Sequence, residues 1–78
     1  MEKTLVINNV KEVYEFVSEC NRTPKSFDIY ASRDKIAVPC ISVMGMFSLD
    51  PSIPFTINYP TGKDMEGFEQ YITKFEVK

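Results

Sequence analysis

Two segments of the chain repeat apolar residues at the three- or four-residue spacing of a helix. Between residues 10 and 20 lysine and glutamates fill the intervening positions, which predicts an amphipathic helix of about three turns. Asn8 or Asn9 can cap its start, and Pro24 closes it because proline has no amide hydrogen to donate. A second helix is expected between residues 65 and 75. The apolar faces consist of Val10, Val13, Val17 and Cys20, widened by Tyr14 and Phe16, and of Met65, Phe68, Ile72 and Phe75, joined by Tyr71.

Other segments alternate apolar and polar residues, or run through β-branched residues, as strands with a buried face do. This pattern predicts four strands, at residues 3–8, 27–32, 36–38 and 55–59. In the second strand, Phe27 should share the buried face with Ile29 and Ala31. The second and third strands should form a hairpin. Pro39 must end the third strand or lie at a sheet edge, because it cannot donate a ladder hydrogen bond.

The stretch CISVMGMFSL, residues 40–49, is apolar at almost every position. With a short helix here, the element order is strand, helix, strand, strand, short helix, strand, helix. Because each strand has one apolar face, this order predicts an α+β fold with a mostly antiparallel four-stranded sheet covered by helices on one side. So thin a core cannot bury every apolar residue of the short helix, and some must face outward.

Length and charge limit what the chain can do. Its 78 residues form one domain, residues 1–78. The formal net charge of -2 leaves no basic stripe for a row of phosphates, so we expect no nucleic-acid partner. No apolar run reaches the ~20 residues that span a bilayer, and the first ten residues lack the features of a secretory signal. We therefore expect a cytoplasmic protein, with Cys20 and Cys40 reduced and buried.

The sequence contains little catalytic chemistry. It has no histidine, which is the commonest general base near neutral pH and the commonest metal ligand. Two cysteines twenty residues apart make no zinc site, and we expect no metal and no cofactor. The neighbours of Cys20, Glu19 and Asn21, would not lower its pKa. The exposed glutamates of both helices are expected to be solvated surface. We expect no enzyme activity.

The element order and the segment ISVMGMFSL together suggest a family. The segment resembles SIMGVMSL, which follows the third strand in HPr, the phosphocarrier protein of the bacterial sugar phosphotransferase system. KTLVI, FDIYASRDKIAV and FTINYPTGKDMEGFEQYI resemble, more weakly, other strands and the last helix of that family. The resemblance implies an open-faced sandwich, with a four-stranded antiparallel sheet and three helices on one face. It also implies the relay of a phosphoryl group from enzyme I to sugar-specific transport proteins.

The chain departs from the family at the residue that carries the phosphoryl group. In the family this is a histidine at the start of the first helix, in the motif Gly-Ile-His-Ala-Arg-Pro. Here the corresponding loop is shorter and contains Asn9, Val10 and Lys11, none of which can form a phosphoramidate. Histidine phosphotransfer is therefore excluded by chemistry, and the resemblance leaves a docking or regulatory module as the leading hypothesis.

A serine of the family is retained at the start of the short helix. In Gram-positive members a serine there is phosphorylated by a dedicated kinase, and the aligned residue is Ser42. Helix amides would favour an anion at this point. The ordinary alternative, which we favour, is that Ser42 only caps the helix.

The same resemblance implies a docking surface. In the family, exposed apolar residues of the short helix bind partner proteins, and the matching residues here are Val43, Met44 and Phe47. Flexible methionine and an aromatic ring suit an adaptable contact. The expected partners are phosphotransferase-system components or a serine kinase. A weak homodimer, and a stand-alone domain whose family history says nothing about its present role, are the alternatives.

Overall fold

Strands and helices follow one another in the order that the sequence predicts. The computed structural model describes residues 1–77, and they form four strands and three α-helices. The elements are β1 (Glu2–Leu5), α1 (Val10–Arg22), β2 (Tyr30–Arg33), β3 (Ile36–Pro39), α2 (Val43–Leu49), β4 (Phe55–Asn58) and α3 (Glu66–Ile72), with short 3-10 turns at Ser26–Asp28, Lys63–Met65 and Thr73–Phe75.

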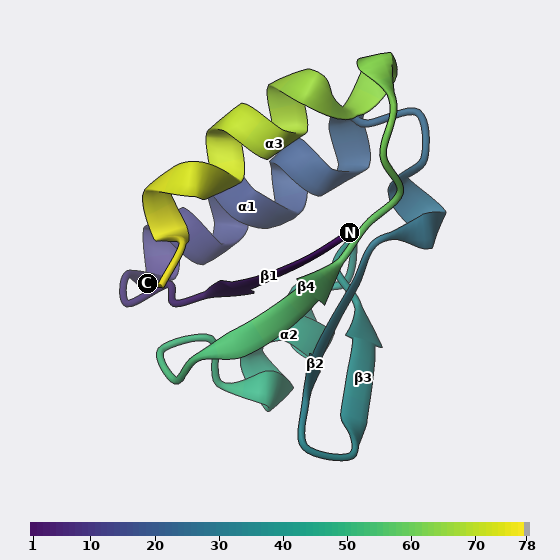
Figure 1. Ribbon diagram of the computed structural model, residues 1–78. Coiled ribbons are helices and arrows are strands. Elements are labelled where there is room, and N and C mark those ends of the chain that lie inside the picture. Colours follow the sequence, from purple (N-terminus) through teal and green to yellow (C-terminus); the bar gives the residue numbers. More distant parts are fainter. Residues whose placement is uncertain (78) are drawn as a thin grey trace.

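The sheet has the strand order β1-β4-β2-β3, and every neighbouring pair is antiparallel. β2 and β3 form the expected hairpin, and Pro39 lies in the edge strand β3, where its missing amide hydrogen costs no ladder bond. Figure 1 shows α1 and α3 lying side by side over the sheet, with α2 beside β2 and β3. The predicted α+β open-faced sandwich, with three helices on one face of the sheet, is confirmed.

The core lies between the sheet and the helices and is rich in aromatic rings. Phe16 of α1 is fully buried, and its ring centroid lies 6.3 to 6.4 Å from those of Phe55, Phe68 and Phe75. These rings come from α1, β4 and the C-terminal helical segment, so one cluster joins three parts of the chain. The predicted apolar face of the closing helix is confirmed, because Met65, Phe68, Ile72 and Phe75 are all buried.

The ends of α1 are fixed by side chains next to it in sequence. Asn9 is the N-cap, and its Oδ1 accepts hydrogen bonds from the amides of Lys11 (2.8 Å) and Glu12 (3.4 Å). At the other end, the amide and the hydroxyl of Thr23 both donate to the carbonyl of Cys20. Pro24 then prevents the helix from continuing. The helix therefore begins and ends where the sequence predicts.

Three details of the prediction are wrong. The first strand ends at Leu5 rather than Asn8, and the amide of Ile7 donates to the carbonyl of Pro51 instead of to a strand. The second strand begins only at Tyr30, because residues 26–28 form a 3-10 turn. Phe27 therefore leaves the core face and is 77% exposed. The third error, the exposure of part of the apolar face of α1, bears on the candidate site.

Candidate functional site

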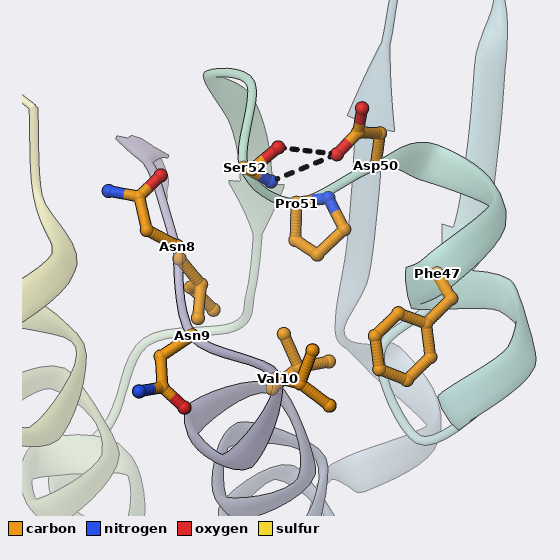
Figure 2. Close-up of a pocket in the computed structure, with 9 residues that line it drawn as sticks. Asn8, Asn9, Val10, Phe47, Asp50, Pro51 and Ser52 are labelled. Atoms are coloured by element: carbon orange, nitrogen blue, oxygen red, sulfur yellow. Dashed lines mark hydrogen bonds between the residues drawn. The ribbon is translucent and has the colours of Figure 1, made fainter.

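The two sets of residues that the resemblance singles out lie next to each other. Asn9, Val10 and Lys11 form the start of α1, whereas Met44 and Phe47 belong to α2, which packs against α1. Val10 and Phe47 line the same surface hollow (Figure 2). The start of α1 and the exposed side of α2 thus form one continuous region of the surface.

Exposed apolar side chains from both helices gather in this region. Met44 is 84% exposed and Phe47 is 38% exposed, while Val10 and Tyr14 of α1 are 60% and 54% exposed. The rings of Tyr14 and Phe47 meet edge to face with centroids 5.7 Å apart. We call these four residues, Val10, Tyr14, Met44 and Phe47, the α1–α2 patch. Its contiguity distinguishes it from scattered surface hydrophobes, which need no explanation.

The helix period explains which residues of α2 face outward. Met46 and Leu49, three residues apart, are fully buried against the core, and Val43 lies half-buried on the same side. Met44 and Phe47 are also three residues apart and occupy the other side. Of the three predicted docking residues, two are therefore exposed, while Val43 is largely a packing residue.

Val10 and Tyr14 belong to the patch, although the sequence pattern assigned them to the apolar face of α1. That face buries only Val13, Phe16, Val17 and Cys20. The signal that could have separated them is the width of the apolar stripe. Six apolar residues spread over more of the helix circumference than one packed face covers, so the residues at one edge of the stripe, Val10 and Tyr14, remain outside.

A hollow of about 270 Å³ lies beside the patch, between the start of α1 and the segment after α2. Figure 2 shows the rings of Phe47 and Pro51 near the start of α1 at Val10, whereas the amide of Asn8 and the carboxylate of Asp50 turn away from the space between them. The walls are therefore mainly apolar and the polar groups lie at the rim. The lining residues are Ile7, Asn8, Asn9, Val10, Val13, Phe47, Asp50, Pro51 and Ser52.

Asp50 supplies a negative charge at the rim of the hollow. It ends α2 in the left-handed conformation, with φ of 57°, and its Oδ1 accepts hydrogen bonds from the hydroxyl (2.6 Å) and the amide (3.3 Å) of Ser52. The Ser52 hydroxyl, the Ser52 amide and the nearby Arg33 hold the pKa of this carboxyl below its usual value. The Arg33 guanidinium donates to the backbone carbonyl of Asp50 at 3.0 Å. Asp50 is thus ionised at neutral pH.

Ser42 is the N-cap of α2, as we favoured. Its Oγ accepts the amide hydrogen of Gly45 at 3.0 Å, and its side chain lies half-buried. Gly45 packs closely here, because a Cβ would lie 3.2 Å from both Ser42 Oγ and Val38 Cβ, and these neighbours would have to move slightly to admit it. The cap therefore sits in a tight contact between α2 and β3.

The cysteine thiols lie in the core and are not exposed for chemistry. Cys20 and Cys40 are both free and fully buried, as expected. A hydrogen bond with the Cys40 thiol and burial together raise the pKa of Cys20 far above its ordinary value. A thiol in this state is a poor nucleophile, because the thiolate is the reactive form.

The part of the chain that the structure describes shows neither a metal-binding cluster nor a membrane-spanning helix. Among residues 1–77, no three cysteine, aspartate or glutamate side chains cluster as a metal site would require. In the same part of the chain, no helix is long and apolar enough to cross a bilayer. No protein-family model, curated protein or solved structure matches the chain.

Proposed function

We propose that this chain is an HPr-like, cytoplasmic docking module that binds phosphotransferase-system proteins without carrying a phosphoryl group on histidine. The observation that carries the proposal is the α1–α2 patch. It lies on the segment whose residues resemble the HPr docking helix, and it extends over the start of α1, where the resemblance puts the phosphoryl site. The chain has no histidine, so docking is the function of that region that remains available.

The side chains of the patch suit a transient contact. Met44 is flexible and polarizable, and the Tyr14 and Phe47 rings add rigid apolar area. Four neighbouring exposed apolar side chains form a patch of the kind that marks interaction sites on monomers. Stable complexes bury about 800 Å² on each partner, so contacts limited to this patch would be weak and readily reversed.

The proposal can be tested with the isotope-labelled chain and purified phosphotransferase components. Enzyme I or a sugar-specific component should shift or broaden the amide signals of α2 and of the start of α1. Met44→Glu should abolish the effect, whereas Lys63→Glu, on the turn before α3, should not. Signals that do not respond, or that respond equally in both variants, would refute docking through the patch.

The same mixture tests the loss of phosphotransfer. With phosphoenolpyruvate and enzyme I the intact mass should stay unchanged, because no imidazole is present to accept the phosphoryl group. An acid-labile gain of one phosphoryl group would contradict this expectation.

Regulation by phosphorylation of Ser42 is the alternative function. The side chain is half-buried rather than closed off, but its Oγ already accepts the Gly45 amide, so a phosphoryl group would have to replace that cap. Incubation with ATP and the serine kinase, followed by mass spectrometry of peptides, tests it. A phosphopeptide lost in Ser42→Ala but kept in Ser48→Ala, the exposed serine of the same helix, would support the alternative. If the kinase leaves the chain unmodified, the alternative is refuted and docking remains the proposed function.

A further inference from the structure

The hollow beside the α1–α2 patch has the size and lining of a receptor for one side chain. Its volume of about 270 Å³ falls below the ~300–1,000 Å³ typical of small-molecule pockets. Ile7 and Val13, buried residues of the core, contribute to its lining, and Val10, Phe47 and Pro51 complete the apolar walls (Figure 2). An aliphatic or aromatic side chain entering it would exchange water for apolar contacts on several sides.

The rim offers one ionic contact to whatever enters. Both hydrogen bonds to the Asp50 carboxylate end on Oδ1, and within residues 1–77 no hydrogen bond to its Oδ2 is found. Ser52 fixes the orientation of the carboxylate, and Arg33 donates to the backbone carbonyl of Asp50 while its positive charge stays near the carboxylate. The carboxylate is therefore charged, oriented and open to a donor from solvent. Such a group selects for a cationic neighbour of the side chain that fills the hollow.

Met44 of a second copy would not meet this requirement. It is the most exposed apolar residue of the chain, and α2 has the sequence VMGMFSL, which contains no charged residue. Inserting Met44 into the hollow of another copy would therefore bring no cation from α2 to Asp50.

We propose that the hollow receives one apolar side chain from a short segment of a partner protein, and that a lysine or arginine within two residues of it pairs with Asp50. This inference rests on the proposed docking function and specifies the chemistry of the partner. The apolar anchor supplies the affinity, since rim charge pairs are worth little. The charge pair supplies discrimination, because an acidic neighbour would be repelled by Asp50.

Short peptides test the inference without knowledge of the natural partner. Three acetylated and amidated tetrapeptides, Gly-Leu-Arg-Gly, Gly-Leu-Glu-Gly and Gly-Ala-Arg-Gly, can be titrated at millimolar concentration into the isotope-labelled chain. The Leu-Arg peptide should shift the amide signals of Val10, Phe47 and Ser52 most strongly. The Leu-Glu peptide should lose the ionic contact, and the Ala-Arg peptide should lose the anchor. Equal responses to all three, or shifts confined to another surface, would overturn the proposal.

Asp50→Asn gives the matched control in the protein. Asparagine tolerates the left-handed conformation and can still accept from Ser52, so the segment should keep its shape. The variant should bind the Leu-Arg peptide roughly two- to five-fold more weakly, the range expected for an exposed ion pair. Its affinity for a Gly-Leu-Gln-Gly peptide should not change. Unaltered binding of the Leu-Arg peptide by a folded Asp50→Asn variant would overturn the proposed ion pair with Asp50. The peptide series with the wild-type chain tests the proposal even if the variant does not fold.

The outcomes separate this inference from the proposed function. Selective Leu-Arg binding without any response to phosphotransferase components would support the hollow and refute the HPr-like docking partners. A response to those components that is unchanged in Asp50→Asn would support docking and refute the ion pair with Asp50. A monomer–dimer equilibrium that Met44→Glu abolishes would show that a second copy occupies the site, and would overturn the inference.

Discussion

The helix α2 carries two methionines, two residues apart, whose surroundings are opposite. Met44 is 84% exposed, whereas Met46 is 0% exposed and packs in the core. Replacing each in turn by glutamate makes the same chemical change on the two sides of one helix. The pair therefore tests both the orientation of α2 and the claim that its outer side is free for docking.

At Met44 the change should cost little. Surface substitutions usually alter the free energy of unfolding by no more than ~0.5 kcal/mol. Residue 44 is also the second residue of α2 after its N-cap, Ser42, where an acidic side chain is favoured by about 0.3 to 1 kcal/mol. We therefore expect Met44→Glu to melt like the parent or slightly above it, while its response to docking partners is lost.

At Met46 the same change should abolish folding. Removing a buried methionine side chain costs about 2 to 5 kcal/mol. Burying an unpaired carboxylate adds several kcal/mol more, unless it takes up a proton. A domain of this length has a total stability of only about 4 to 12 kcal/mol, at ~0.05–0.15 kcal/mol per residue. Met46→Ala, which removes contacts without adding charge, should remain folded with a lower midpoint.

Circular dichroism during urea and thermal unfolding measures all three variants. A cooperative transition for Met44→Glu and Met46→Ala, with none for Met46→Glu, is the expected result. If Met44→Glu fails to melt cooperatively, residue 44 is part of the core and the docking proposal is wrong at this position. If Met46→Glu melts like the parent, the orientation of α2 described above is wrong.

The fold could be predicted from the sequence because local signals agreed with one another. The helix period between residues 10 and 20, the cap at Asn9 and the proline at position 24 define α1 without reference to distant residues. The alternation of Phe55, Ile57 and Tyr59, all buried, defines β4 in the same way. Because each strand has one apolar face, an antiparallel sheet covered by helices on one side is the arrangement that buries all of these faces.

The start of β2 could not be predicted, because two structures were compatible with the same residues. FDIYAS alternates as a strand does, but Ser26–Asp28 forms a 3-10 turn in which the amide of Asp28 donates to the carbonyl of Lys25. Alternation describes which residues could share a face. It does not say that the chain is extended there, so Phe27 was assigned to a face that it does not reach.

The hollow was beyond prediction because its walls meet only through tertiary contacts. Pro51 reaches the start of α1 through the hydrogen bond from the amide of Ile7 to its carbonyl, across more than forty residues. The position of the Asp50 carboxylate depends on the left-handed backbone conformation of Asp50. This conformation is uncommon for residues other than glycine, and no sequence pattern predicted it here. The apolar stretch at residues 40–49 indicated the region, but the neighbours of Phe47 had to come from the structure.

Three further predictions concern the core. Phe68→Ala should lower the free energy of unfolding by roughly 3 to 5 kcal/mol, because the Phe68 ring packs against Phe16 and Tyr59. Gly67→Ala, with open space around residue 67, should stabilise α3 by up to ~1 kcal/mol. Equal urea midpoints for the two variants would contradict this. Cys20 should resist iodoacetamide in the folded protein and react in denaturant, because the hydrogen bond with the Cys40 thiol and burial suppress its thiolate. Rapid alkylation of the folded chain, read by mass, would refute this. Burial first, and then Glu15 and Glu19, raises the pKa of Tyr71 to about 12, and within residues 1–77 its hydroxyl has no hydrogen-bond partner. Because an unfolded tyrosine ionises near pH ~10, the unfolded state loses its proton first, so stability should fall as the pH rises from about 10 to about 12. Tyr71→Phe should lose less stability than the parent between pH ~9 and ~11.5, and urea midpoints that fall equally in both proteins would show that Tyr71 does not cause the loss.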